Sequence, residues 1–314
     1  MRIVVVGAGP AGATAALVLA RQKRHEVVLV DRDTFPRVKT CGSALSPRSI
    51  ALLQELELAP VLRPKAYGIC GLRFTGPVGR LSTMSGPEAA WVIPRAELDA
   101  EIAFAAERAG ARFVQGVKVI RALRDASGHI RGVSDGKQEI EADLVLFADG
   151  AHSRFSEDTR TKRQIATIMG WWEGVSFQPG LVEMWFDRRV KPWYGWLFPE
   201  TSKRVNIGIC YDPADPVQPR DIFWAVVGKH VGARMNGADM VQRFRGAPIV
   251  YTERPERVSA PGALWIGEAA RLTNAATGEG ICYALQSGAM AAQLVGRSQD
   301  GALVEAYRQA IRRT

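Results

Sequence analysis

Cysteine and histidine are scarce in this chain, with four of each among 314 residues. The cysteines are scattered through the sequence and lack the paired spacing of a metal site. The histidines are also isolated from one another, which is typical of loop or surface positions. The sequence therefore predicts free thiols rather than disulfides, and no metal site. The cysteines are Cys41, Cys70, Cys210 and Cys282.

Long apolar runs are missing as well, because glycine or a charged residue interrupts each one before the ~18 residues that a membrane span requires. Met1 and Arg2 lead at once into the apolar run of residues 3–6. This start lacks the separate charged region, apolar region and cleavage site of a signal peptide. We therefore expect a cytoplasmic protein without a transmembrane segment.

Charge is unevenly balanced, with 41 Lys and Arg residues against 32 Asp and Glu residues and a formal net charge of +9. A positive surface favours anionic ligands or anionic surfaces. The basic residues are dispersed, however, and no nucleic-acid motif accompanies them. We expect no nucleic-acid partner, and the sequence leaves a peripheral membrane or protein partner open.

A glycine-rich turn follows the first apolar run. Gly7, Gly9 and Gly12 lie between residues 3–6, which we expect to form a strand, and a helix. Glycines at this spacing allow a tight turn, the approach of a pyrophosphate to the backbone and close packing of helix on strand. Asp31 ends the next apolar run, where a carboxylate can accept hydrogen bonds from a ribose. The pattern predicts binding of an ADP group.

A second glycine-rich segment lies near the other end of the chain. Residues 267–281 follow the short apolar run 263–266 and precede an expected helix over 281–295. Between these two segments, Asp143 is followed by the apolar residues 144–148, which end in Asp149 and Gly150. Anion-binding turns at opposite ends of one chain indicate a long cofactor that is held from both sides.

The rest of the pattern predicts an α/β fold with an inserted domain. Residues 66–93 and 165–211 alternate as strands of an antiparallel sheet, and residues 220–245 are expected to be helical. The nucleotide-type segments stand at the start, middle and end of the chain. We therefore expect a cofactor domain over 1–65, 92–160 and 250–314, and a substrate domain over 66–91 and 161–249.

Aromatic residues are concentrated in the expected inserted domain. Tyr194, Trp196 and Phe198 alternate before Pro199, so on a strand they would project to one face. Such an apolar wall suits an isoprenoid, an indole or another flat apolar group. A sheet face packed into the core is an equally good interpretation of the same pattern.

The three turn motifs, in this order, resemble those of the FAD-dependent oxidoreductases that include the aromatic hydroxylases, the p-hydroxybenzoate hydroxylase-like superfamily. The resemblance covers nearly the whole chain. It implies a Rossmann-like, three-layer FAD-binding domain with an inserted antiparallel-sheet substrate domain. The FAD-binding residues that it implies are Gly7, Gly9, Gly12, Asp31, Arg32, Arg37, Arg95, Val119, Asp149, Gly150, Gly267, Glu268, Gly278 and Gly280.

One departure from the family pattern concerns the third motif. The family usually has Gly-Asp at this place, whereas this chain has Gly267 followed by Glu268. A glutamate can still meet a ribityl hydroxyl or a phosphate-bound water. Its extra methylene group would shift FAD or weaken its binding.

Two further segments resemble the geranylgeranyl reductases within this superfamily. Residues 35–48 resemble their Cys-Gly loop through Cys41 and Gly42, and residues 193–199 resemble their Tyr-x-Trp-x-Phe-Pro segment. In that group both segments border the substrate cavity near the flavin, which makes Cys41 and Gly42 candidate catalytic positions. A small packed side chain is as good an interpretation of Cys41. Residues 193–199 also resemble a segment of flavin halogenases.

Three functions are consistent with these motifs. The first is an FAD-dependent reductase that reduces a double bond in an apolar small molecule, with NAD(P)H as electron donor. The second is an FAD-dependent monooxygenase or halogenase that acts on an aromatic or amino-acid-derived substrate. The third is a non-catalytic flavoprotein. The Cys-Gly loop favours the reductase, since the fold alone serves all three.

Overall fold

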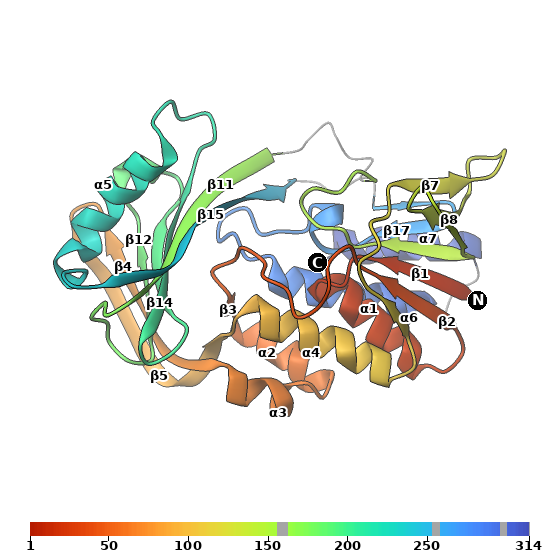
Figure 1. Cartoon of the computed structure of the whole chain (residues 1–314), viewed down its shortest axis with the longest axis horizontal. Coiled ribbons are helices and arrows are strands. Elements are labelled where there is room, and N and C mark those ends of the chain that lie inside the picture. Colours follow the sequence, from red (N-terminus) through yellow and green to blue (C-terminus); the bar gives the residue numbers. More distant parts are fainter. Residues whose placement is uncertain (156–162, 253–257, 296–299, 314) are drawn as a thin grey trace. The chain divides into compact units, whose positions relative to one another are not determined.

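The computed structural model describes residues 1–155, 163–252, 258–295 and 300–313. The chain divides into two compact units, labelled by their elements in Figure 1. Unit 1 comprises Met1–Val38, Ala96–Arg163 and Val250–Thr314, and unit 2 comprises Lys39–Arg95 and Gln164–Ile249. The predicted α/β fold is confirmed, because the start, middle and end of the chain build one sheet and the intervening segments build another.

Unit 1 is built on a six-stranded sheet whose central strands are parallel. Apolar β-branched residues fill these strands, and the sheet is covered on both faces, as parallel sheets usually are. Only β16 is antiparallel to its neighbour. The order is β16 (Ser259–Ala260), β17 (Ala263–Trp265), β10 (Leu144–Phe147), β1 (Arg2–Val6), β2 (Glu26–Val30) and β6 (Arg112–Val114).

Helices cover one face of this sheet and a small second sheet covers the other (Figure 1). Helix α1 (Pro10–Arg21) packs along α6 (Ile281–Val295), and β8 lies against β10. This gives the three layers that the resemblance implied. The remaining elements of unit 1 are α4 (Arg95–Arg108, whose first residue belongs to unit 2), β7 (Arg121–Arg124), β8 (Ile130–Ser134), β9 (Glu139–Glu141), η4 (Gly267–Ala270) and α7 (Asp300–Arg312).

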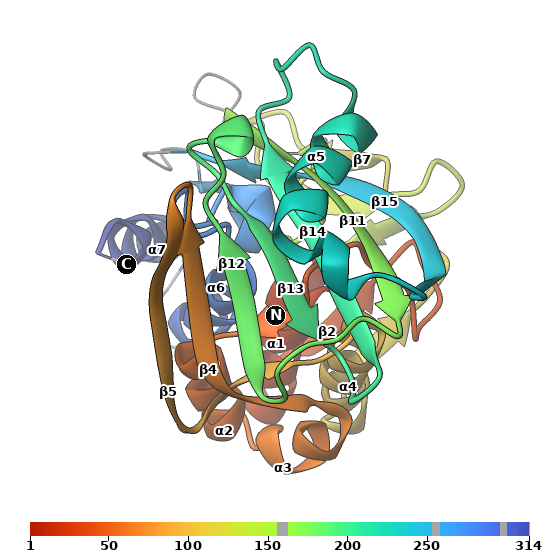
Figure 2. The same cartoon turned by 90° about the vertical axis from the view of Figure 1, so that its left-hand side faces the viewer.

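Unit 2 contains an eight-stranded curled sheet, which faces the viewer in Figure 2. Its pairings are antiparallel around β14, whereas β12 and β4 are parallel. The order is β15 (Asp239–Tyr251), β11 (Arg163–Glu173), β14 (Arg204–Tyr211), β13 (Gly195–Pro199), β12 (Leu181–Trp185), β4 (Tyr67–Gly76), β5 (Gly79–Val92) and β3 (Ala44–Leu45).

Helix α5 (Pro219–Val231) lies across one face of the unit 2 sheet (Figure 2). Its buried residues Phe223 and Val226 join a core with Trp172, Leu197 and Ile207. Burial of each such side chain contributes about 1.5–3 kcal/mol, which makes this face the main core of the unit. The short helices of unit 2 are α2 (Pro47–Glu55), α3 (Ala59–Leu62), η1 (Arg63–Lys65), η2 (Arg188–Val190) and η3 (Gly232–Arg234).

The helix that the sequence predicts over residues 220–245 is wrong in its second half. α5 ends at Val231, and residues 239–251 form β15 at the edge of the sheet. The Phe244 ring packs edge-on against Phe223, with centroids 4.8 Å apart. Burial of Phe244 against the α5 core therefore holds this segment as a strand.

The boundary of the inserted part also differs from the expected one. Residues 39–65 cluster with unit 2 rather than with the nucleotide-type segments. The reason is that β3 pairs with β5, Ala44 with Val92, and α2 packs against both strands. The expected boundary at residue 160 lies outside the described residues.

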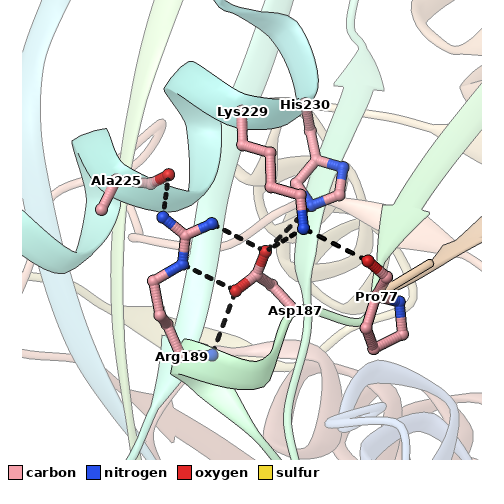
Figure 3. A network of polar contacts seen from close by, with 6 residues as sticks. All are labelled: Pro77, Asp187, Arg189, Ala225, Lys229 and His230. Atoms are coloured by element: carbon pink, nitrogen blue, oxygen red, sulfur yellow. Dashed lines mark hydrogen bonds and ion pairs between the residues drawn. The ribbon is translucent and has the colours of Figure 1, made fainter. Parts of the chain in front are cut away.

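A buried carboxylate ties α5 to the turn after β12 (Figure 3). Asp187 is 3% exposed, and both of its oxygens accept hydrogen bonds from the Arg189 side chain, at 2.8 and 2.9 Å. Lys229 and His230 of α5 lie 3.3 and 3.2 Å from the same carboxylate. The hydrogen bonds from Arg189 hold the pKa of Asp187 well below its usual range. His230 also stacks on Trp185, with the rings 5.5 Å apart.

This network predicts a pH-dependent stability. Burial lowers the pKa of His230 below its ordinary value of 6.5, so an unfolded chain binds a proton there before the folded chain does. The free energy of unfolding should therefore fall as the pH drops from 6.5 through the folded pKa. Urea titrations across this range test the effect in wild type and His230→Gln.

The stability difference between these two proteins isolates His230. His25 also has a lowered pKa from burial, but it contributes equally to both. We expect the advantage of wild type over His230→Gln to shrink on acidification. An advantage that stays constant across the range would show that His230 titrates alike in the folded and unfolded chains.

Candidate functional site

The glycine turn of unit 1 has the conformation that its spacing predicts. Gly7 adopts a φ of +101°, and a Cβ there would lie 2.5 Å from the Ala148 carbonyl oxygen. A Cβ on Gly12 would lie 1.9 Å from the Gly7 oxygen. The absence of a Cβ at both positions therefore lets α1 pack closely against the ends of β1 and β10. Gly9 is the N-cap of α1 and, as a glycine, supplies no side-chain capping hydrogen bond.

Asp31 closes the turn from the side of β2. The residue is 7% exposed, and its Oδ2 accepts a hydrogen bond from Ala8 N at 2.6 Å. Its Oδ1 accepts another from Asp33 N at 2.9 Å. Each carboxylate oxygen can accept more than one bond, so a ribose hydroxyl can share this group. Arg32 beside it is exposed, and its Nε lies 3.7 Å from the carboxylate of Asp33.

Arg37 lies over the glycine turn. Its Nη2 is 3.0 Å from the fully buried carboxylate of Asp99 in α4, and a Cβ on Gly9 would approach the same Nη2 within 3.7 Å. The Arg37 Nη1 is buried and has no acceptor among the described residues. Sequence reasoning did not single out Asp99, because an acidic residue in the first half of a helix is common.

The end of β10 presents Asp149 next to the same turn. Asp149 Oδ1 is buried and has no hydrogen-bond partner among the described residues. Burial raises the pKa of this carboxyl, while a hydrogen bond from Ser153 and the charge of Arg271 oppose the rise. Gly150 follows with a φ of +78° and open space on its Cβ side.

Arg271 is a residue that sequence reasoning missed. It is 4% exposed, adopts a left-handed φ of +62°, and donates from Nη1 to the Ala151 oxygen at 3.1 Å. It thereby fastens the third motif to the turn after Asp149. The available signal was an arginine within the run of small residues 267–278.

The third motif leads from β17 into α6. Gly267 N donates to Ser287 of α6 at 2.9 Å, which holds the motif on the helix. Asn274 closes the loop before α6, since its Oδ1 accepts from Ala276 N and Thr277 N. Gly278 and Gly280 then lead into the helix. The N-terminal end of α6, which carries the partial positive charge of the helix dipole, therefore begins directly after these two glycines.

Glu268 has a definite partner. Its Oε1 accepts a hydrogen bond from Val250 N at the end of β15, at 3.1 Å. An aspartate is one methylene group shorter and would not reach this donor from the same backbone position. The longer side chain therefore serves the backbone of unit 1, which accounts for the departure from Gly-Asp.

Glu268→Asp should separate the contribution of Glu268 to stability from its effect on FAD binding. Loss of the bond to Val250 N should lower the free energy of unfolding by about 1 kcal/mol. The released shorter carboxylate should tighten FAD, as the family pattern implies. Glu268→Gln keeps the length and the acceptor, so its stability should match wild type. Urea unfolding and flavin titration measure both quantities, and unchanged or weaker FAD affinity in Glu268→Asp would contradict this account.

Aromatic rings form a row on one face of the unit 2 sheet. Tyr194, Trp196 and Phe198 follow one another with ring centroids 6.2 and 5.9 Å apart. Phe186 lies 6.2 Å from Tyr194, and Phe74 of β4 lies 5.9 Å from Phe186. Sequence reasoning missed these last two rings because they come from other segments. Pro199 ends β13 and is buried.

Trp196 is held in place by its own polar group. Its Nε1 donates to Asn206 Oδ1 at 2.7 Å, and the ring lies over Gly208, where a Cβ would be 2.2 Å from Cζ2. The indole N–H is thus satisfied inside the sheet. Tyr194 and Trp196 are 9% and 4% exposed, so these two rings are buried in unit 2.

The Cys-Gly loop packs at the end of this row. A Cβ on Gly42 would lie 3.1 Å from the Phe198 ring, so the two segments that resemble the reductases meet within unit 2. Cys41 is half-buried, and its Sγ accepts a hydrogen bond from Ser43 N at 3.3 Å. This backbone contact fixes the direction of the thiol.

Two other expected positions are Arg95 and Val119. Arg95 begins α4 and is half-buried. Val119 lines a cavity of about 170 Å³ together with Val28, Val114 and Val133. The chain near Val119 passes the end of β2, because Val117 N donates to the backbone carbonyl oxygen of Asp31 at 2.9 Å.

Residues 1–295 match the model of a protein family described as "FAD binding domain". The chain belongs to this FAD-binding family. It is therefore an FAD-dependent oxidoreductase with the fold that the three motifs indicated.

Relatives of this FAD-binding protein are named as reductases. It is 34% identical over 319 residues to "Menaquinone reductase" of Mycolicibacterium smegmatis, covering 93% of this chain and 76% of that protein. It is 29% identical over 320 residues to "Digeranylgeranylglycerophospholipid reductase" of Methanothrix thermoacetophila, covering 93% and 77%. A geranylgeranyl bacteriochlorophyll reductase-like protein from Thermoplasma acidophilum shares the fold, with a TM-score of 0.88, 21% identity and coverage of 99% and 83%.

The groups that unit 1 leaves open fit FAD. The N–H groups at the start of α1, where the N-cap Gly9 supplies no side-chain cap, and the buried Nη1 of Arg37 are donors, which phosphate oxygens complement. The buried Oδ1 of Asp149 is an acceptor, which a hydroxyl complements. Among the described residues, no group of His, Cys, Asp and Glu side chains is arranged to hold a metal ion. Within the same residues, no helix has the length and apolar character needed to cross a membrane.

Proposed function

We propose that this protein is an FAD-dependent reductase that saturates a carbon–carbon double bond in an isoprenoid chain. FAD, when bound, supplies the hydride. The observation that carries the proposal is the row of five aromatic rings with successive centroids 5.9–6.2 Å apart. The row ends at Phe198, against the Cys-Gly loop.

An elongated apolar ligand is the partner that such a row favours. The rings come from β4, the turn after β12, and β13, so they follow one another across three strands of the sheet. The Trp196 N–H is already bonded to Asn206, and the rings therefore discriminate by shape and apolar contact. The names of the two relatives refer to menaquinone and to digeranylgeranylglycerophospholipid, and both molecules carry isoprenoid chains.

We assign roles to the residues of unit 1 within this proposal. Asp31 and the glycine turn hold the ADP half of FAD, and Arg37 bonds the pyrophosphate. Asp149 accepts a hydrogen bond from a ribityl hydroxyl. Residues 267–280 hold the flavin half, with the positive end of α6 stabilising negative charge there. Arg32, Arg95, Val119 and Gly150 remain proposed FAD contacts.

The residues of unit 2 have a separate part. Tyr194, Trp196, Phe198 and Pro199 bind the substrate chain and exclude water from it. Cys41 and Gly42 line the same end of the row, where the backbone bond from Ser43 fixes the thiol. We propose NAD(P)H as the electron donor. Anaerobic mixing of the FAD-loaded protein with NADH and with NADPH tests this, because reduction of the flavin bleaches its absorption spectrum.

Product mass tests the proposed reaction. FAD-loaded protein, reductant and menaquinone with an unsaturated side chain are incubated without oxygen, and the extract is then exposed to air before mass spectrometry. Air returns a reduced quinone ring to the quinone, whereas a saturated double bond keeps its hydrogens. We expect a product that retains two added hydrogens.

The other outcomes contradict the proposal in different ways. A gain of two hydrogens that disappears in air would assign quinone-ring reduction instead. A gain of one oxygen or one halogen, obtained with oxygen present, would assign the monooxygenase or halogenase alternative. Absence of product with NADH, NADPH and dithionite would favour the non-catalytic flavoprotein.

A further inference from the structure

The turn between β4 and β5 exposes apolar side chains. Val78 is 89% exposed, the highest fraction of any large hydrophobic side chain that the structure describes, and Leu81 and Met84 follow with 63% and 55%. Single exposed hydrophobic residues are ordinary on protein surfaces. Three such side chains lie within seven residues at the end of one hairpin, and a local excess of exposed apolar side chains is typical of an interaction site. We call residues 76–84 the hairpin tip.

Basic side chains lie on two elements that contact the base of the hairpin. Lys229 Nζ donates to the Pro77 oxygen at 3.4 Å (Figure 3), and Phe186 N donates to the Thr75 oxygen at 2.8 Å. These bonds place the start of the 186–192 segment and the end of α5 beside the hairpin. Four exposed cations from these two elements form what we call the basic collar: Arg188, Arg189, Lys191 and Lys229.

The charge of the basic collar is only partly neutralised. Asp187 is the carboxylate at its centre, and it binds Arg189 and Lys229 together. His230 also contacts Asp187, but it carries no negative charge that could neutralise the collar. Burial lowers its pKa. The nearby Glu183 is already paired with Arg234 at 2.6 Å. Among the described residues of these two elements, one carboxylate therefore accompanies four cations, and the collar carries positive charge.

We propose that the hairpin tip and the basic collar dock on an anionic lipid bilayer. The apolar side chains of Val78, Leu81 and Met84 enter the interfacial layer, and the cations contact the lipid headgroups. A protruding turn with a cationic rim matches such a layered surface, which is negative outside and apolar within. A protein partner would need a pocket for the tip and acidic groups around it.

The aromatic row begins beside this surface. Phe74 lies on β4, two residues before Gly76, and Phe186 is the residue whose N–H bonds to Thr75. The row then continues through Tyr194 to Phe198. Docking would bring the start of the row to the membrane, so that an isoprenoid lipid can pass from the bilayer along the rings. This last step rests on the proposed function, whereas docking itself does not.

Vesicle sedimentation of the FAD-loaded full chain tests docking without any turnover. The probes are vesicles of phosphatidylcholine alone and vesicles of phosphatidylcholine with phosphatidylglycerol. We expect binding to the anionic vesicles, with an affinity that falls steeply as salt is added. The double variant Val78→Glu/Leu81→Glu should bind at least tenfold more weakly. Val61→Glu, at a valine 41% exposed on α3, is the matched control and should bind as wild type does.

A second variant tests the cations. Arg188→Gln/Lys191→Gln avoids the two cations that hold Asp187, so its fold should be retained. We expect weaker binding and a shallower salt dependence. Equal binding by wild type and the hairpin variant, or no binding of wild type to anionic vesicles, would overturn the proposal. A dimer in light scattering that the hairpin variant abolishes would assign the tip to a second copy and would overturn it as well. If vesicles bind but no lipid is reduced, only the proposed function fails.

Discussion

Gly12→Ala is expected to abolish FAD binding, with a loss of affinity of more than 100-fold. An alanine Cβ would lie 1.9 Å from the Gly7 oxygen, a backbone atom that cannot move without moving the whole turn. Helix α1 would have to shift from β1, at a cost of about 1–3 kcal/mol or more from overpacking. Flavin fluorescence titration and urea unfolding measure the two effects.

Two other alanine variants distinguish the effect of changing this turn from the effect of replacing any glycine. Gly9→Ala would place its Cβ 3.7 Å from Arg37 Nη2, an ordinary contact, so the fold should be retained. FAD should still bind more weakly, because the pyrophosphate approaches this backbone. Gly228→Ala in α5 meets nothing within 4 Å and should raise stability by about 0.5–1 kcal/mol. Wild-type FAD affinity in Gly12→Ala would contradict the assignment of this turn.

Arg37→Gln is expected to weaken FAD by about 10- to 100-fold, since a hydrogen bond to a charged group contributes about 1.5–3 kcal/mol. The buried Nη1 of Arg37 is the donor that we assign to the pyrophosphate. The same variant removes the ion pair between Arg37 and the buried Asp99. It should therefore also lower the free energy of unfolding by about 3–5 kcal/mol.

A double variant distinguishes these two effects. Arg37→Gln/Asp99→Asn removes both charges of the pair, so most of the lost stability should return. FAD affinity should stay low, because the donor to the pyrophosphate is still missing. Recovery of affinity together with stability would mean that Arg37 acts only through the fold. Isothermal titration with FAD, beside urea unfolding of each variant, provides both readouts.

The parts of the site that the sequence predicted are those encoded locally. Gly7 to Gly12, Asp31 and the Asp149-Gly150 pair each follow an apolar strand, and a strand followed by a glycine turn has few alternative structures. The alternation of Tyr194, Trp196 and Phe198 likewise needs only the period of a strand. These features needed no knowledge of tertiary contacts.

The features that sequence reasoning missed depend on partners far along the chain. Arg271 acts through Ala151, and Glu268 acts through Val250 N. The strand β15 replaces an expected helix because Phe244 packs on α5. In each case the decisive contact joins segments that the local pattern treats as unrelated, so tertiary packing overrides the local preference.

Anaerobic re-oxidation of the reduced flavin tests the central claim most directly. The FAD-loaded protein is reduced with one equivalent of dithionite and mixed with a geranylgeranyl lipid that contains no quinone. We predict that the oxidised flavin spectrum returns with this lipid and does not return with its fully saturated counterpart. A flavin that stays reduced with both lipids, yet is oxidised by air, would contradict the account of this protein as an isoprenoid reductase.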